Sequence, residues 1–240
     1  MTLNIYIGTE DNQLIPQKVL MYSIRKFAKG KVNLIPCKQE VERVGGTNFG
    51  FVRFFVPSYN KFKGIAVYID ADQLVFDDIN KLAETLDDKH TIALVNNAEG
   101  NFGKKPVGKI NQTSVMVLNC EKLKDWMPDI LFNNVVSNKA ELLNGQIHYK
   151  NFMKLDWFDQ SQIQSIDPAW NHFNIVKKDT KLTHFSHVRS QPWKNPSHPL
   201  CDFWREWLTE AIRNREVGRF ELLLEILKGH VDKRFLRCLL

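Results

Sequence analysis

The chain has 240 residues, of which 43% are hydrophobic and 25% charged, and this balance excludes an intrinsically disordered protein. Lysine and arginine outnumber aspartate and glutamate by 33 to 27, without the dense basic clusters of a dedicated nucleic-acid-binding protein, so the net charge of +6 suits a small anionic ligand. Four separated cysteines form no Cys-x-x-Cys pair, and no apolar run approaches the roughly 18 residues that span a bilayer. We therefore expect a soluble, cytoplasmic protein.

Strand and helix patterns alternate along the first half of the chain. Short apolar runs predict strands over 3–8, 32–36, 64–69, 91–95 and 114–118. Helices are predicted after the first strand, over the aromatic stretch 51–59, and from a cap at Asp77 and Asp78 to about residue 86. The segment 96–111, rich in Gly, Asn and Lys, is predicted to be a loop. This alternation predicts an α/β domain with a mixed, mostly parallel sheet.

The C-terminal part changes to helical periodicity. We predict a main domain over 1–212 and an amphipathic helical tail over 213–240, in which basic and apolar residues interleave. Seven acidic residues over 201–240 nearly cancel the positive charge. Packing against the domain or a partner is therefore favoured, and peripheral contact with a membrane is the alternative.

Two carboxylates, Asp70 and Asp72, stand where the buried strand 64–69 runs into a loop. Side chains two residues apart in extended backbone face the same way, so both can reach one hard divalent cation. The carboxyl ends of strands are also where open α/β sheets bind ligands. The alternative is that both carboxylates are solvated loop charges without a ligand, and the strongly apolar strand before them favours the metal site over this alternative.

A second candidate segment surrounds His184 in the most basic block of the chain, residues 171–200, which carries +4. The imidazole of His184 could complete a metal site begun by Asp70 and Asp72, while Arg189 and Lys194 could neutralise phosphate oxygens. A core or surface histidine without a ligand role is the alternative.

Several motifs in a fixed order give the sequence a specific resemblance. They are Asn4 to Glu10, Arg53, Val67 to Asp72 with Asp77-Asp78, Thr113 to Asn119, Trp170-Asn171, and His184-Phe185 leading to Gln191-Pro192-Trp193. This order resembles the family 8 glycosyltransferases, which include glycogenin-like proteins and lipopolysaccharide galactosyl- and glucosyltransferases of the GT-A fold. The similarity covers about residues 3–210.

The resemblance implies a retaining, Mn²⁺-dependent (or Mg²⁺-dependent) transfer of a hexose from a UDP-sugar to a hydroxyl of a glycan, lipopolysaccharide or similar carbohydrate or glycolipid acceptor. Asp70, Asp72 and His184 match the family's metal ligands. Donor-binding positions are implied at the first strand end, beside the metal and in the basic block: Ile7, Gly8, Thr9, Glu10, Arg53, Asp70, Ala71, Asp72, Ser114, His187, Arg189 and Lys194. The family's Asp-Gln motif falls on Asp159 and Gln160, with Asp156 as a rival, so these three are the catalytic candidates.

The sequence departs from the family's C-terminal signature at two positions. His187 stands where the family has glycine, and Gln191 replaces a lysine, so Arg189 or Lys194 would supply the missing positive charge. Two other functions stay open. One is a haloacid-dehalogenase-like phosphatase with Asp70 as nucleophile, and the other is a non-catalytic relative that binds a UDP-sugar.

Overall fold

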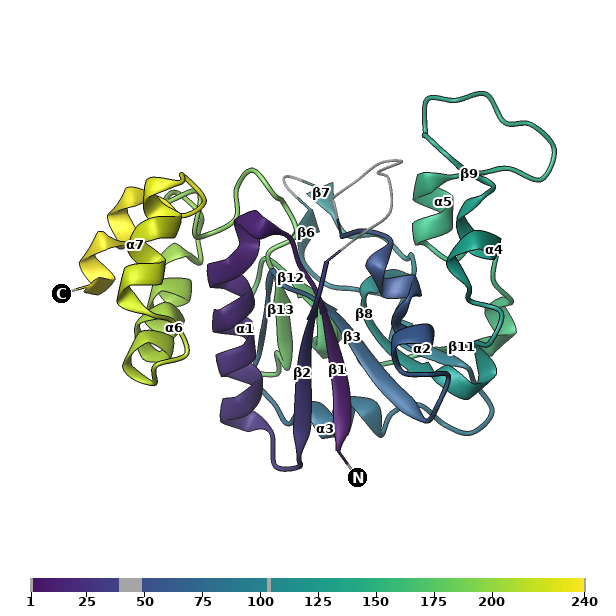
Figure 1. Ribbon diagram of the computed structural model, residues 1–240, viewed down its shortest axis with the longest axis horizontal. Coiled ribbons are helices and arrows are strands. Elements are labelled where there is room, and N and C mark those ends of the chain that lie inside the picture. Colours follow the sequence, from purple (N-terminus) through teal and green to yellow (C-terminus); the bar gives the residue numbers. More distant parts are fainter. Residues whose placement is uncertain (1, 39–48, 103–104, 240) are drawn as a thin grey trace.

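The computed structural model describes residues 2–38, 49–102 and 105–239, and its centre is a six-stranded sheet in the order β11-β5-β8-β3-β1-β2 (Figure 1). The strands are β1 (Leu3–Gly8), β2 (Val32–Cys37), β3 (Ile65–Asp70), β5 (Ile92–Val95), β8 (Gln112–Asn119) and β11 (Ile163–Ser165). β1 pairs in parallel with β2 and β3, and β5 with β11, whereas β8 is antiparallel to β3 and β5. The predicted mixed, mostly parallel sheet is confirmed.

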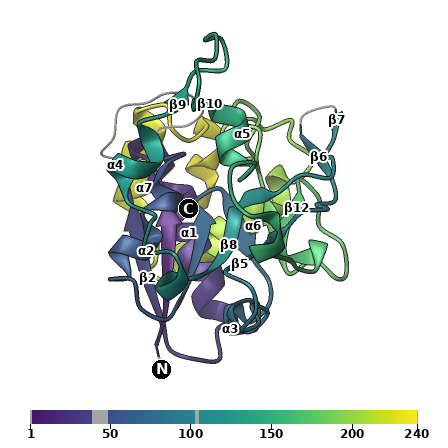
Figure 2. The same cartoon turned by 90° about the vertical axis from the view of Figure 1, so that its right-hand side faces the viewer.

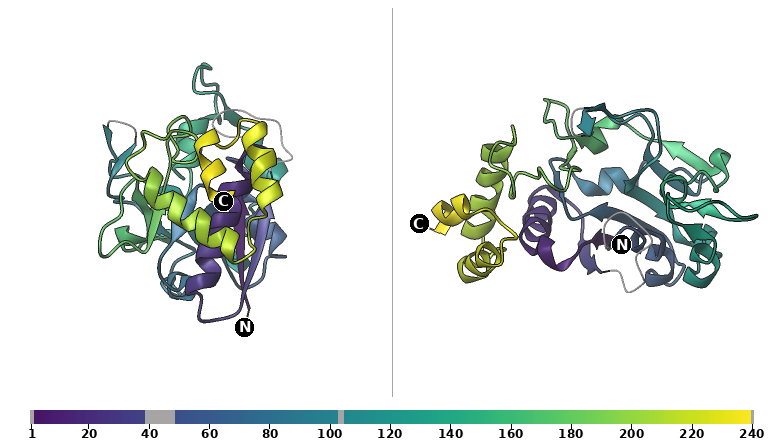
Figure 3. Two further views of the ribbon diagram at one scale, coloured as in Figure 1. Left: turned by 90° about the vertical axis from the view of Figure 1, so that its left-hand side faces the viewer. Right: turned by 90° about the horizontal axis from the view of Figure 1, so that it is seen from above.

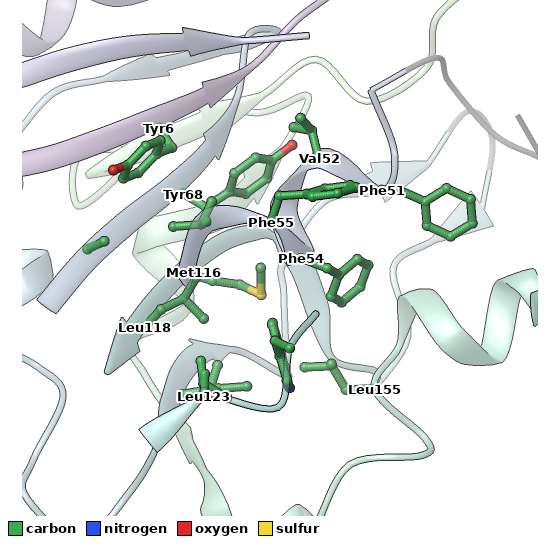
Figure 4. Close-up of a cluster of buried hydrophobic side chains, with 14 of the residues drawn as sticks. Tyr6, Phe51, Val52, Phe54, Phe55, Tyr68, Met116, Leu118, Leu123 and Leu155 are labelled. Carbon is green, nitrogen blue, oxygen red and sulfur yellow. The ribbon is translucent and has the colours of Figure 1, made fainter. Parts of the chain in front are cut away.

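Alternate residues of the central strands serve two hydrophobic cores, one on each face of the sheet. Tyr6, Tyr68 and Met116 point to one face, where they meet the aromatic stretch that contains Phe51 and Phe54 (Figure 4). The intervening residues, such as Ile5, Ile7 and Ile69, belong to the core of the opposite face. Because both faces are covered, the central strands read as continuous apolar runs in the sequence.

Several predicted elements differ from the structure in detail. The stretch 51–59 forms two short helices, η2 (Val52–Phe54) and α2 (Val56–Tyr59), because Pro57 lacks an N–H and fits only the first turn of a new helix. The helix capped by Asp78, α3 (Ile79–Ala83), ends about three residues earlier than predicted. The predicted loop 96–111 carries a short hairpin of β6 (Asn101–Phe102) and β7 (Lys105–Pro106).

The remaining short elements lie in the second half of the chain, and residues such as Val135, Tyr149 and Phe152 pack in the core that covers one face of the main sheet. These elements are η3 (Cys120–Lys122), α4 (Pro128–Phe132), β9 (Val135–Val136), β10 (Ile147–His148), α5 (Tyr149–Met153), η4 (Gln160–Gln162) and η5 (Pro168–Asn171). Figure 2 shows α5 and the β6-β7 hairpin at the same end of the molecule.

A second, three-stranded sheet brings distant parts of the chain together. It consists of β12 (His172–Phe173), β13 (Leu182–His184) and β4 (Gln73–Val75). β13 is antiparallel to β4, and their register places His184 opposite Gln73. The histidine therefore lies beside the segment that follows β3, although more than 100 residues separate the two in sequence.

The C-terminal helices α6 (Cys201–Arg213), α7 (Arg219–Leu227) and η6 (Lys233–Leu239) lie beside α1 (Leu14–Phe27), which follows β1 through η1 (Asp11–Gln13) (Figure 3). Ile15 and Val19 of α1 share a core with Trp204, Leu208 and Phe235. The predicted tail thus packs against α1, while its contact with a membrane stays a prediction. No helix among the described residues is long and apolar enough to span a bilayer.

Candidate metal and nucleotide-sugar site

The two carboxylates lie at the C-terminal end of β3. Asp70 is the last residue of that strand, Asp72 directly precedes β4, and the two residues are 6% and 5% exposed. Between them, the backbone N–H of Ala71 donates to the carbonyl oxygen of Gly8 at 2.9 Å, which fixes the turn against the end of β1. A Cβ on Gly8 would lie 2.0 Å from the Tyr68 hydroxyl, so the close approach of the Tyr68 side chain to the end of β1 requires glycine.

His184, the last residue of β13, completes a cluster of three metal-ligating side chains. Its Nε2 lies 3.3 Å from Asp72 Oδ1, and one ligand atom from each of Asp70, Asp72 and His184 lies within 4.8 Å of the others. The imidazole is 6% exposed and packs against the Phe173 ring, with 4.7 Å between ring centroids. Two carboxylates and an imidazole form a donor set that suits a divalent cation.

Arg53 and Tyr68 hold the Asp70 carboxylate. Arg53 donates to both carboxylate oxygens, at 3.0 and 3.1 Å, and to Thr113 Oγ1 at 2.7 Å. The Tyr68 hydroxyl donates to Asp70 Oδ1 at 2.5 Å. Burial raises the pKa of Asp70, although the charge of Arg53 opposes the shift, and burial also raises the pKa of Tyr68 well above 10.0. The phenol therefore stays protonated and available as a donor at neutral pH.

Buried polar atoms without a hydrogen-bond partner concentrate at this site and in the segments that adjoin it. In the described part of the chain they include Asp72 Oδ1, His184 Nδ1 and Arg53 Nε. Others are Asn12 Oδ1, both amide atoms of the Gln13 side chain, Gln73 Oε1, Asn171 Oδ1, Gln191 Oε1 and Trp193 Nε1, whereas Trp126 Nε1 lies at a different cavity. Because buried polar groups in folded proteins are almost always paired, this concentration indicates a place where an ion, ligand or water supplies the missing partners.

A cavity of about 530 Å³ opens beside the cluster and is lined by Asp70, Asp72 and His184 together with Arg53 and Ser114. Its volume lies in the range of small-molecule sites. The Ser114 hydroxyl accepts a hydrogen bond from the Asn171 side chain at 3.0 Å, and its carbonyl accepts one from Gln73 at 3.1 Å. These contacts tie β8 to the Asp-x-Asp turn and to the segment before β12.

Gln191 and Lys194 lie in the segment where the sequence departs from the C-terminal signature of the family 8 glycosyltransferases. Gln191 is 1% exposed, and its Nε2 donates to Asp72 Oδ2 at 2.8 Å and to the Phe185 carbonyl at 3.1 Å. Lys194 is half-buried; burial lowers the pKa of its ammonium group, while Glu10 and Asp72 raise it. Of the two candidates for the missing charge, Lys194 is therefore the half-buried one and the one whose pKa is raised by a residue of the cluster, Asp72.

Two other residues of the predicted basic segment are placed differently. Arg189 is exposed, and His187 Nδ1 lies 2.6 Å from the Ser190 hydroxyl. Val188 between them lines the cavity. Their predicted contacts with a donor stay predictions.

The predicted donor-binding residues at the end of β1 lie next to the Asp-x-Asp turn. Gly8 pairs with Asp70 across the sheet, and the N–H of Thr9 donates to the Cys37 carbonyl at 3.0 Å. Ile7 belongs to the core and Glu10 is half-buried. This arrangement brings the strand end and the candidate metal ligands into one neighbourhood.

The three catalytic candidates occupy two kinds of position. Asp156 and Gln160 line an adjoining cavity of about 470 Å³, which shares Asn111 and Lys154 with the larger one. The Asp159 carboxylate instead accepts hydrogen bonds from the backbone N–H and hydroxyl of Ser161, at 2.9 and 2.8 Å, and caps η4. Their roles in catalysis stay predictions.

Comparison with solved structures gives the class of the fold. The chain is similar to the bifunctional glycosyltransferase WbbM (TM-score 0.62, 14% identity, 86% of this chain) and to the glycosyltransferase GlyE of Streptococcus pneumoniae TIGR4 (TM-score 0.64, 16% identity, 87% of this chain). It is also similar to the galactosyltransferase LgtC in complex with donor and acceptor sugar analogues (TM-score 0.59, 11% identity, 87% of this chain and 96% of LgtC). It spans only 49% of WbbM and 60% of GlyE. The chain therefore has the GT-A glycosyltransferase fold.

Comparison of sequences gives one further likeness. The chain is 27% identical over 233 residues to "Protein CDI" of Arabidopsis thaliana, covering 86% of this chain and 85% of that protein. No family model matches the chain.

Sequence reasoning missed several residues that shape the site. The sequence assigns Tyr68 to an apolar strand, Thr113 only to the motif that begins before the strand 114–118, and Gln191 to the loss of a lysine. Each of the three makes a buried hydrogen bond, to Asp70, Arg53 and Asp72 respectively. Polar side chains beside an Asp-x-Asp motif or inside an otherwise apolar strand are a signal that points to such partners.

Proposed function

We propose that the protein is a glycosyltransferase that transfers a hexose from a UDP-sugar to an acceptor hydroxyl with retention of configuration, using Mn²⁺ or a similar cation. The observation that carries the proposal is the convergence of Asp70, Asp72 and His184 at the strand ends of a GT-A fold, where Asp72 Oδ1 and His184 Nδ1 have no hydrogen-bond partner. The resemblance to family 8 glycosyltransferases supports the hexose, the UDP-sugar and the retaining outcome.

The residues present fit a divalent cation. Asp70, Asp72 and His184 would hold it, and when bound it would stabilise negative charge on the diphosphate leaving group. Arg53 and Tyr68 keep the Asp70 carboxylate in one orientation, and Gln191 does the same for Asp72. Such supporting contacts hold ligands in place before the substrate arrives.

Other residues would bind and orient the donor. The half-buried Lys194, which is near enough to Glu10 and Asp72 for both to raise its pKa, would neutralise a phosphate oxygen that departs with the leaving group. The backbone at Gly8 and Thr9, beside Asp70, would accommodate the nucleoside, and Ser114 the sugar. Retention requires either attack from the same face as the departing phosphate or a covalent intermediate, for which Asp156, Asp159 and Gln160 are the candidates.

The two alternative functions lead to different expectations. For the phosphatase, Asp70 would be a free nucleophile, whereas both of its oxygens here accept hydrogen bonds from Arg53. A non-catalytic relative would bind UDP and Mn²⁺ without turnover. Titration calorimetry with UDP in the presence and absence of Mn²⁺, followed by a screen of UDP-sugars for hydrolysis, separates these cases.

The decisive variants are Asp70→Asn and Asp72→Asn. We expect each to reduce Mn²⁺-dependent UDP-sugar turnover by at least about 100-fold, because an amide is a weaker ligand and carries no charge. Asp129→Asn is the matched control, since Asp129 lies on exposed α4, outside the cluster and the cavity. Turnover and Mn²⁺ dependence that survive in both site variants would show the assignment to be wrong.

A further inference from the structure

The cavity beside the metal cluster is lined by three lysines, Lys105, Lys150 and Lys154, which we call the cavity lysines. Lys105 comes from β7, Lys150 from α5 and Lys154 directly follows α5. Among the residues that the structure describes, none of their ammonium groups forms an ion pair, and the acidic side chains that line this cavity are Asp70 and Asp72. The cavity therefore has basic walls away from the metal cluster.

The donor does not account for this charge. The two carboxylates, one divalent cation and the diphosphate of a UDP-sugar leave about two negative charges at the cluster, and Arg53, which is paired with Asp70, balances one of them. Lys194 adds a further positive charge on the Asp72 side. The charges of the filled donor site are therefore balanced without the cavity lysines, whose ammonium groups still lack a counter-charge.

The lysines also extend beyond the donor site. Lys154 lines the adjoining cavity as well, together with Lys109 and one acidic residue, Asp156, and Ile110 lines both cavities. Apolar walls, which include Met153 and Val188, lower the local dielectric constant and strengthen the attraction of the cavity lysines for an anion. A neutral glycan would leave these ammonium groups without a counter-charge.

We propose that the acceptor carries a phosphate or similar anionic group, which the cavity lysines bind while the acceptor hydroxyl faces the donor sugar. This proposal rests on the proposed function, because it assigns the rest of the cavity to an acceptor. It predicts recognition of a phosphorylated sugar or sugar phospholipid in preference to a neutral glycan.

The test is calorimetric binding of glucose, glucose 6-phosphate and inorganic phosphate to the full chain saturated with UDP and Mn²⁺, which occupy the donor site. We expect glucose 6-phosphate to bind at least about tenfold more tightly than either glucose or inorganic phosphate. The triple variant Lys105→Gln/Lys150→Gln/Lys154→Gln should reduce this preference to about twofold or less, and the KM for UDP-sugar hydrolysis should change less than about twofold.

A matched control removes the same number of charges elsewhere. Lys124→Gln/Lys139→Gln/Lys178→Gln changes exposed lysines that line neither cavity, and the preference should be retained. The proposal is overturned if glucose and glucose 6-phosphate bind equally, if inorganic phosphate binds as tightly as glucose 6-phosphate, or if the cavity variant weakens donor hydrolysis instead. Failure of UDP and Mn²⁺ to bind at all would count against the proposed function and is seen before any sugar is added.

Discussion

Gly8 and Tyr68 make a sharp prediction about how the strand ends hold Asp70. In Gly8→Ala the new Cβ would lie 2.0 Å from the Tyr68 hydroxyl and 2.8 Å from its Cζ. Tyr68 is fully buried, so its ring must move, and the movement breaks its 2.5 Å hydrogen bond to Asp70. Overpacking costs about 1–3 kcal/mol, and the loss of a buried hydrogen bond to a charged group costs about 1.5–3 kcal/mol. We expect Gly8→Ala to lower the free energy of unfolding by about 2.5–6 kcal/mol, the sum of the two contributions.

A double-mutant cycle isolates the contact. Tyr68→Phe removes the hydroxyl, and therefore both the hydrogen bond to Asp70 and the closest clash, while the ring stays in the core. The hydrogen bond cannot be lost twice, so Gly8→Ala should cost about 1.5–3 kcal/mol less in the Tyr68→Phe background. Urea unfolding of the four proteins measures this coupling. Strictly additive effects would refute the idea that Gly8 acts through the Tyr68 hydroxyl.

Two further predictions concern Gln191 and Glu225. Gln191→Leu should weaken Mn²⁺ binding about 10- to 100-fold in calorimetry, because Asp72 Oδ2 loses its buried donor, whereas unchanged affinity would show that Gln191 does not position Asp72. Burial alone would raise the pKa of Glu225, but hydrogen bonds from Lys228 and His230 outweigh it and the pKa is lowered. The ionised Glu225 thus stabilises the fold at pH values above its unfolded pKa, and this stability is lost as the pH falls through the lower, folded pKa. Glu225→Gln should flatten the acid limb of a plot of unfolding free energy against pH, and an unchanged slope would contradict the shift.

The sequence was most informative where one local pattern determines position. The apolar run before Asp70 predicted a buried strand, and the spacing of Asp70 and Asp72 predicted that both would reach one point; the structure places them within one cluster. Asp78 was predicted to begin a helix, and its carboxylate accepts a hydrogen bond from the N–H of Asn80 at 3.1 Å. In each case neighbouring residues supply the whole physical cause.

The sequence was least informative where a contact depends on how distant segments meet. The approach of Arg53 to the diphosphate or the sugar stays a prediction, and its hydrogen bonds to Asp70 are a contact that the sequence did not predict. That contact arises because the folded chain brings η2 next to Asp70 at the end of β3, and the spacing of residues along the sequence does not predict this. The cavity lysines also come from segments that meet only in the folded chain, so their local patterns gave no sign of a shared wall.

The arrangement around His184 indicates why the C-terminal helices matter to the site. Phe185 follows His184 and packs edge to face on Trp193, with ring centroids 6.1 Å apart. Trp193 in turn contacts Trp204 of α6, and its carbonyl accepts a hydrogen bond from the Asp232 N–H at 2.7 Å. His184 is thus joined to the tail by a continuous series of contacts through Phe185 and Trp193. Because packed aromatic residues adjust little, the tail is better understood as a support for β13 than as a separate appendage.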